Sequence, residues 1–305
     1  MKWRMFICAI CFLIGGCSLN IPLEDQFSDP DAITDVLSAR SLLASAYKAM
    51  PQQIFQLSVL SDDFCPSQHL NKDMSLQGLY NWREVEMTEL AGTLWAGYYA
   101  VIAEVNALLA RIDAVVTLDE TEKLEKMRIV CEAKALKSWC YFDLLRLFAP
   151  RYEGNENKDG IILKKRVELD FLPRSSVKEC VTEIRTLLNE ARNVDNTQKN
   201  VYWLSDKAVA YLQVELELYA GNYPAVLELT KDLETEYPES VLGADVYKYL
   251  WSSENSDARI FGKYQLEQIY MDIRFDTFEK GDYLVLSQNV DYEEEDIRKE
   301  WSEIP

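Results

Sequence analysis

Histidine and glycine are scarce in this chain, and their scarcity argues against several kinds of active site. The only histidine among 305 residues is His69, so histidine-based zinc sites, Ser-His-Asp triads and haem ligation have little support. Only 11 glycines are present, and the G-x-G-x-x-G and G-x-x-x-x-G-K patterns that cradle nucleotides do not occur. With no catalytic arrangement in view, a binding or scaffolding role is the expectation.

Basic residues are few as well. The chain has 32 Lys and Arg against 51 Asp and Glu, a formal net charge of −19. A field of this sign repels phosphate backbones, so nucleic-acid binding is not predicted. The 48% apolar and 27% charged content is that of a globular protein with enough length to bury a sizeable core, in one large domain or two small ones.

The many acidic residues show no pattern that predicts an enzyme active site or a metal-binding site. A glycosidase needs two carboxylates roughly 5–9.5 Å apart across the sugar, and no pattern singles out one pair among the 51 acidic residues. The run Asn155-x-Asn157-x-Asp159-Gly160 resembles half of a calcium-binding EF-hand loop, but Arg166 stands where the bidentate Glu is needed. We therefore predict a turn there, no metal or cofactor, and no enzymatic activity.

The first 16 residues predict the signal peptide of a lipoprotein. Lys2 and Arg4 precede ten apolar residues, 5–14, which are too few for a bilayer span of about twenty. Residues 13–17 (LIGGC) resemble a bacterial lipobox, in which the cysteine is lipidated and becomes the first mature residue. Lipidation of Cys17 predicts a protein held on a membrane by acyl chains. The alternative is ordinary cleavage after a small residue.

Helical periodicity covers most of the chain after a polar tether at residues 17–30. The expected helices span about 30–50, 88–112, 117–148, 176–193, 205–220 and 224–237. Residues 31–237 are thus predicted to form one mainly α domain. Residues 51–87 show no sustained period and are interpreted as a long loop. Residues 238–305 are expected to be less regular, with strand-like runs at 260–261 and 283–286.

Helix starts and the helix interior give further expectations. Capping boxes are predicted at Thr117, with Glu120, and at Ser176, and Ser205 is expected to cap the next helix. Residues 135–149 are apolar nearly all round, which predicts a central buried helix. Its Asp143 and Arg146 are expected to pair as structural ions. Core positions are predicted for Trp95, Tyr98 and Trp139, and buried free thiols for most of Cys65, Cys131, Cys140 and Cys180.

The last two predicted helices, at 205–237, resemble a tetratricopeptide pair. Gly221, Tyr223 and Pro238 match its turn and exit positions, whereas Val214 stands at the usual first glycine. A more specific signal is the order of landmarks along the chain: 43–47 (LASAY), 61–63 (SDD), Trp95-x-x-x-Tyr99-x-x-Ile102-x-x-x-Asn106, 132–136 (EAKAL), 141–148 (YFDLLRLF), 160–163 (GIIL), 173–177 (PRSSV), 218–223 (LYAGNY) and 258–261 (ARIF). Together with the lipobox, this order resembles the SusD/RagB family of outer-membrane lipoproteins over residues 17 to about 298.

The resemblance implies a fold, a location and partners. It implies tetratricopeptide-like stacked helix pairs with long loops, on the outer face of the outer membrane. It also implies non-catalytic binding of glycans or other nutrients, as a lid over a SusC-like TonB-dependent transporter. Family members continue well past residue 305, so a short or truncated form is expected. The alternative is a tetratricopeptide-like lipoprotein scaffold that binds protein partners and no sugar.

Sugar-binding residues are expected in the segment 51–87. A sugar offers hydroxyl groups and an apolar C–H face, so its site needs flat aromatic rings and amide or carboxylate partners. This segment supplies a group of such side chains, with Trp82 as the leading platform: Gln68, His69, Asn71, Tyr80, Asn81 and Trp82. The alternative for the aromatic side chains is packing against the neighbouring helices.

Overall fold

Helices dominate the computed structural model, which describes residues 33–66, 74–168, 170–192, 202–236, 260–262, 283–285, 293 and 296. In chain order these are α2 (Val36–Lys48), α3 (Ile54–Leu60), α4 (Met74–Tyr80), α5 (Glu84–Arg111), α6 (Glu120–Phe148), α7 (Val177–Ala191), α8 (Asp206–Tyr219) and α9 (Tyr223–Glu236). A single 3-10 turn, Ile112–Ala114, follows α5. The predicted mainly α class is confirmed.

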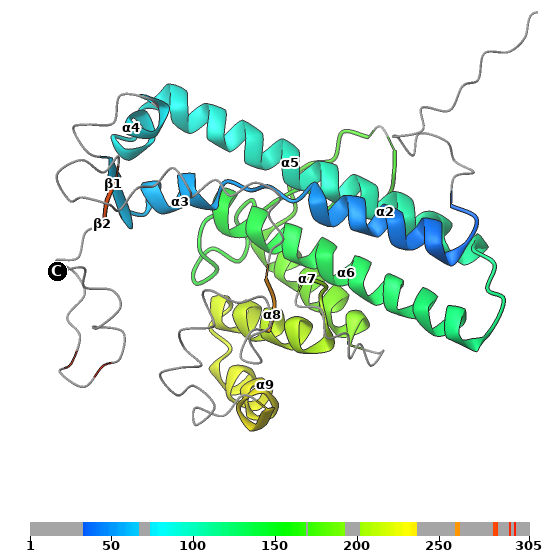
Figure 1. The fold of residues 1–305 in the computed structure, drawn as a ribbon. Coiled ribbons are helices and arrows are strands. Elements are labelled where there is room, and N and C mark those ends of the chain that lie inside the picture. The colour runs from blue at the N-terminus through cyan, green and yellow to red at the C-terminus, as the bar shows by residue number, and fades with distance from the viewer. Residues whose placement is uncertain are drawn as a thin grey trace, which may run out of the picture.

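Helix α6 is the centre of the bundle. Figure 1 shows α2 and α5 along one side of α6, α7 and α8 on the other, and α9 outermost beyond α8. Most of the second half of α6 is buried, with Leu136, Tyr141 and Leu144 fully so, whereas Arg146 and Leu147 near its end are exposed. The central buried helix predicted from the apolar run is therefore confirmed, and it joins both sides of the molecule into one hydrophobic core.

The prediction of a long loop at 51–87 is wrong. This segment holds α3, α4 and the short strand β1 (Phe64–Pro66), and α5 begins at Glu84 rather than Thr88. Helices α3 and α4 have seven residues each, about two turns, which is too short for a helical repeat to show in the sequence. Strand β1 pairs antiparallel with β2 (Tyr283–Val285), which confirms the strand expected at 283–286. Residues 260–262 form no strand.

Hydrogen bonds from side chains to the backbone determine where several helices begin. The expected caps Ser176 and Ser205 are confirmed, since each side chain accepts from the backbone N–H three residues on. The capping box at Thr117 is wrong, because Asp119 Oδ1 accepts from the Glu122 N–H at 2.8 Å and caps α6 instead. Helix α2 likewise begins later than predicted: Asp35 is its N-cap, and the helix begins at Val36 rather than near residue 30.

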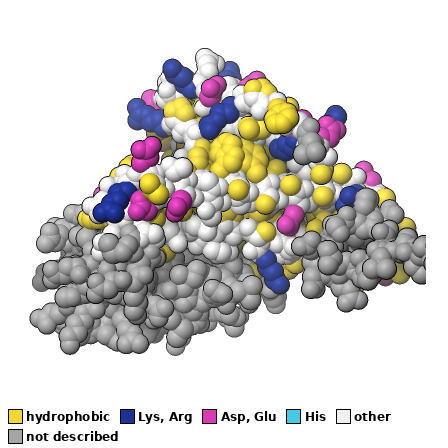
Figure 2. Space-filling view, turned by 90° about the horizontal axis from the view of Figure 1, so that it is seen from above, with side chains coloured by type: hydrophobic (Ala, Val, Ile, Leu, Met, Phe, Trp, Pro, Cys, Tyr) yellow, Lys and Arg dark blue, Asp and Glu magenta, His cyan; other side chains and the backbone are white. Residues whose placement is uncertain are grey.

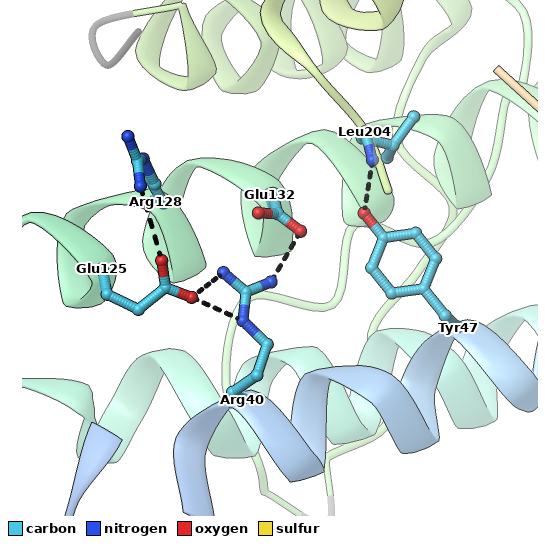
Figure 3. A network of polar contacts seen from close by, with 6 residues as sticks. All are labelled: Arg40, Tyr47, Glu125, Arg128, Glu132 and Leu204. Atoms are coloured by element: carbon cyan, nitrogen blue, oxygen red, sulfur yellow. Dashed lines mark hydrogen bonds and ion pairs between the residues drawn. The ribbon is translucent and has the colours of Figure 1, made fainter. Parts of the chain in front are cut away.

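A partly buried ion network joins α2 to α6 (Figure 3). Arg40 donates through Nη1 to Glu132 Oε2 at 2.9 Å and through Nε to Glu125 Oε1 at 2.8 Å. Glu132 is only 1% exposed. The Arg40 guanidinium also lies 4.9 Å from the centre of the Trp203 ring. The segment before α8 is thereby held against the α2–α6 interface.

Helix α5, together with the 3-10 turn after it, is long and apolar enough to cross a membrane by length and composition alone, and no other described helix is. This helix packs against α2 and α6, and its buried residues include Leu94, Tyr98 and Val101. Seen from above the view of Figure 1, the surface of the molecule shows hydrophobic side chains gathered near its middle, with charged side chains around them (Figure 2).

Candidate functional site

Three of the predicted ligand-binding residues lie together where α4 ends and α5 begins. Tyr80 is the last residue of α4, and Asn81 and Trp82 form the turn before α5. We call these three residues the α4–α5 corner. The other candidates, Gln68, His69 and Asn71, and the predicted lipidation site Cys17, lie outside the described residues.

Trp82 has an unusual backbone conformation. Its φ of 54° is in the left-handed region, and its N–H donates to the Leu79 carbonyl oxygen at 2.9 Å. The next amide, of Arg83, donates to the Gly78 carbonyl oxygen at 2.9 Å, so the two bonds close the end of α4. Glycine or asparagine normally occupies this position, and a bulky residue there costs on the order of 1–3 kcal/mol.

Trp82 as a whole residue is 65% exposed, so burial does not offset this strain. Beside it, Tyr80 is half-buried and packs against the core. The Asn81 side-chain amide donates to the Gln77 carbonyl oxygen at 2.7 Å, which leaves its own carbonyl oxygen as an acceptor. The corner therefore presents one open aromatic face with an amide acceptor next to it in the chain.

A cavity of about 440 Å³ lies between the start of α3, the middle of α5 and the second half of α6. This volume falls in the usual range of small-molecule pockets, roughly 300–1,000 Å³. We call it the α3–α6 cavity. Its apolar lining consists of Pro51, Ile54, Leu57, Leu94, Leu147 and Phe261.

Charged and polar groups line the rest of this cavity. Asp143 accepts through Oδ2 from the Tyr98 hydroxyl at 2.9 Å and through Oδ1 from Arg146 at 2.5 Å. The predicted Asp143–Arg146 pair is therefore confirmed. Burial, reinforced by the Asp143 carboxylate, raises the pKa of Tyr98, so its hydroxyl stays protonated and keeps donating to Asp143.

Two further side chains complete the α3–α6 cavity. Trp139 is half-buried and meets Phe261 edge to face, with 5.1 Å between the ring centres. Gln53 precedes α3, and its Oε1 is buried with no hydrogen-bond partner in the part of the chain that the structure describes. Buried polar atoms usually have such a partner, so this unpaired acceptor at the cavity wall is available to a hydrogen-bond donor of a ligand.

Sequence reasoning placed Tyr98 and Trp139 in the core and gave Asp143 and Arg146 a structural pairing. The burial of Tyr98 confirms its core position, and Trp139 packs against the core from a half-buried position. The cavity that these residues share was missed. The available signal was the spacing of Trp139, Asp143 and Arg146 on one stripe of the mostly apolar second half of α6.

Thiols and carboxylates give no metal site in the described residues. Cys131, Cys140 and Cys180 are buried thiols that are not joined in disulfides, as predicted, and burial raises the pKa of Cys131 and Cys180. The calcium-like run at 155–160 forms a turn, in which the Lys158 N–H donates to the Asn155 carbonyl oxygen at 2.9 Å.

Comparison with known proteins identifies the family. Residues 23–214, well over half of the chain, match the SusD-like family model described as starch-binding and associating with the outer membrane. No curated protein matches the sequence. The resemblance to the SusD/RagB family is thereby confirmed.

Solved structures show the same fold. A SusD superfamily protein from Bacteroides fragilis is 21% identical with a TM-score of 0.63, covering 77% of this chain and 57% of its own. A protein from Bacteroides vulgatus described as sugar-binding is 21% identical with a TM-score of 0.62, covering 75% and 54%. A laminarin-binding SusD-like protein is 20% identical with a TM-score of 0.52, covering 68% and 45%.

This chain thus spans about half the length of the solved structures that it resembles. The similarity lies in the helical bundle, since the family match ends within α8. At this level of identity the solved structures establish the fold, and the family model establishes membership. The chain belongs to the SusD-like family of starch-binding proteins that associate with the outer membrane.

Proposed function

We propose that this protein is a non-catalytic glycan- or nutrient-binding lipoprotein of the cell surface, anchored through Cys17. In this proposal it works with a SusC-like TonB-dependent transporter in nutrient uptake. Family membership supports glycan binding, as do relatives that are described as sugar-binding and laminarin-binding. The observation that carries the proposal is Trp82, an aromatic ring held in solvent by a strained backbone.

The chemistry of the α4–α5 corner suits a neutral sugar. The apolar face of a pyranose stacks on an indole ring, and amide groups bond to its hydroxyls. An aromatic contact contributes about 1 kcal/mol, and each net hydrogen bond about 1 kcal/mol. One open ring with a few hydrogen bonds gives roughly −3 to −5 kcal/mol, a dissociation constant of about several millimolar to a few hundred micromolar.

Weak binding fits the proposed partnership with a transporter. A protein tethered beside an import channel holds captured sugar at a high effective concentration. Release into the channel must be fast, and a millimolar or micromolar site releases its ligand readily. The acyl anchor and the polar tether at residues 17–30 supply this arrangement in the proposal.

A glycan array followed by isothermal titration tests the binding site. We expect Trp82→Ala to weaken glycan binding by about fivefold or more, since one aromatic contact is lost. Tyr223→Ala is the matched control, because Tyr223 is also an exposed aromatic residue but lies at the start of α9. Equal binding by both variants and the wild type would refute the assignment of the corner.

Trp82→Gly separates binding from folding. Glycine adopts the left-handed conformation without strain. The free energy of unfolding of this variant is therefore expected to be about 1 kcal/mol higher than that of the wild type. Its glycan affinity should nevertheless fall as in Trp82→Ala. Urea titration measures the stability, and a variant that loses both stability and binding would indicate a packing role for the indole ring.

A second candidate function, a scaffold for protein partners, has support in the last helix pair. Tyr211, Leu218, Tyr223 and Leu227 of α8 and α9 are large hydrophobic residues with exposed side chains. A pull-down from solubilised outer membranes discriminates the two functions. Recovery of a TonB-dependent transporter supports the first, whereas other partners together with an absence of glycan binding favour the scaffold.

A further inference from the structure

We infer that the α3–α6 cavity is a second ligand-binding site, for a small uncharged molecule that joins a flat apolar ring to hydroxyl groups, as in a phenyl glycoside. This inference does not depend on the α4–α5 corner. Leu94, which lines the cavity, lies ten residues beyond Glu84 at the start of α5. At 1.5 Å per residue, the two places are about 15 Å apart along that helix.

The apolar lining defines one part of the ligand. Ile54 and Leu57 of α3 face the cavity together with Leu94 of α5. Trp139 and Phe261 add aromatic surface, with their rings 5.1 Å apart and nearly perpendicular. A phenyl ring or the C–H face of a pyranose removes this surface from water on binding.

The polar groups define the other part. Gln53 Oε1 is buried and accepts no hydrogen bond from the described residues. Each Asp143 oxygen accepts one hydrogen bond, from Tyr98 or Arg146, and therefore keeps lone pairs for another donor. The groups in need of a partner are thus acceptors, which a ligand with hydroxyl donors satisfies.

The charges around the cavity disfavour an ionic ligand. Arg146 neutralises Asp143 and also lies 3.9 Å from Glu215. The Arg146 guanidinium also stacks on the Phe142 ring, 4.5 Å from its centre, and this contact further restricts the position of the guanidinium. Among the described residues that line the cavity, a phosphate or carboxylate meets no unpaired cation, because Arg146 already pairs with two carboxylates. An uncharged ligand avoids the cost of leaving an ion unpaired.

Isothermal titration with phenyl glucoside, phenyl galactoside and phenyl mannoside tests the site, with phenol and the three free sugars as comparison ligands. We expect saturable binding of at least one phenyl glycoside, tighter than that of phenol or of the sugar alone. Ile54→Trp, an enlargement at an exposed position that lines the cavity, should abolish this binding. Leu227→Trp, the same enlargement on the exposed surface of α9, should leave it unchanged.

Gln53→Leu tests the orphaned acceptor. Loss of one neutral hydrogen bond should weaken phenyl glycoside binding by about threefold to tenfold. The melting temperature should stay equal or rise, since the variant removes a buried polar atom that has no partner. Unchanged affinity in Gln53→Leu would contradict the role given to this amide.

The outcomes separate the two sites. Binding that Ile54→Trp abolishes and Trp82→Ala spares supports the cavity. Binding that Trp82→Ala abolishes and Ile54→Trp spares belongs to the α4–α5 corner and overturns the inference. The inference also fails if folded wild-type protein binds none of the phenyl glycosides, whatever the outcome for longer glycans.

Discussion

Lys137 is a buried amine whose titration should be visible in the stability of the protein. It is 4% exposed, and its Nζ donates to Asn106 Oδ1 at 2.6 Å. Asn106 in turn donates to the Lys164 carbonyl oxygen at 2.9 Å. Burial lowers the pKa of Lys137 to about 8.

The free energy of unfolding should therefore rise between pH 8 and about 10. In this window the unfolded chain keeps the lysine proton while the folded chain releases it, so raising the pH favours the fold. The slope contributed by Lys137 approaches 1.4 kcal/mol per pH unit. Urea titrations at several pH values measure it. Lys137→Met should lack this slope, and an equal slope in the variant would assign the titration elsewhere.

Arg40 is expected to be among the most sensitive single positions in the fold. Arg40→Met leaves Glu132 buried without its guanidinium partner, which should cost about 3–5 kcal/mol of unfolding free energy. The double variant Arg40→Met with Glu132→Leu should recover much of this loss. Lys231→Met, which breaks the exposed pair with Glu228, is the control, and it should leave the free energy of unfolding nearly unchanged.

At the scale of elements, the start of α6 offers a direct comparison of two competing caps. Asp119→Ala removes the side chain that accepts from the Glu122 N–H and should cost about 0.5–2 kcal/mol. Thr117→Ala alters the residue that the sequence pattern favours but that does not cap the helix, so it should be nearly neutral. Thermal unfolding of the two variants measures the difference, and equal losses would contradict the observed cap.

The same helix start shows what sequence patterns reveal and what they miss. Both Thr117 and Asp119 have Glu three residues later, so either could begin a capping box, and only the path of the chain selects Asp119. At Ser176 there was one candidate, and the pattern was sufficient. Long helices such as α6 were predicted from the helical period of their apolar residues. Helices α3 and α4 were missed because each is too short for that period to repeat.

The candidate sites were harder to predict than the helices. Trp82, Tyr80 and Asn81 are adjacent in the chain, so their proximity was evident, but the left-handed backbone of Trp82 was not. The α3–α6 cavity draws on α3, α5, α6 and Phe261, which are distant in sequence. Packing of these elements creates the cavity, and a helical pattern alone identifies only the face that is buried.

At the scale of the whole molecule, the fold should open first at α9. This helix packs mainly on α8 and shares a small separate cluster formed by Ala210, Val214 and Leu233. Helix α6 instead lies inside the main core. Amide hydrogen exchange should therefore be at least about tenfold faster in α9 than in the second half of α6. Equal protection would indicate that both helices unfold as one unit.

The strained backbone at Trp82 has an evolutionary consequence. Selection for folding alone favours glycine at that position, because glycine relieves the left-handed strain and little buried surface is lost with the indole ring. Under the proposed function, an aromatic residue should therefore persist only in lineages in which the α4–α5 corner still binds its ligand. Across relatives, the identity of the residue at this position would then indicate which chains keep a binding site at the α4–α5 corner.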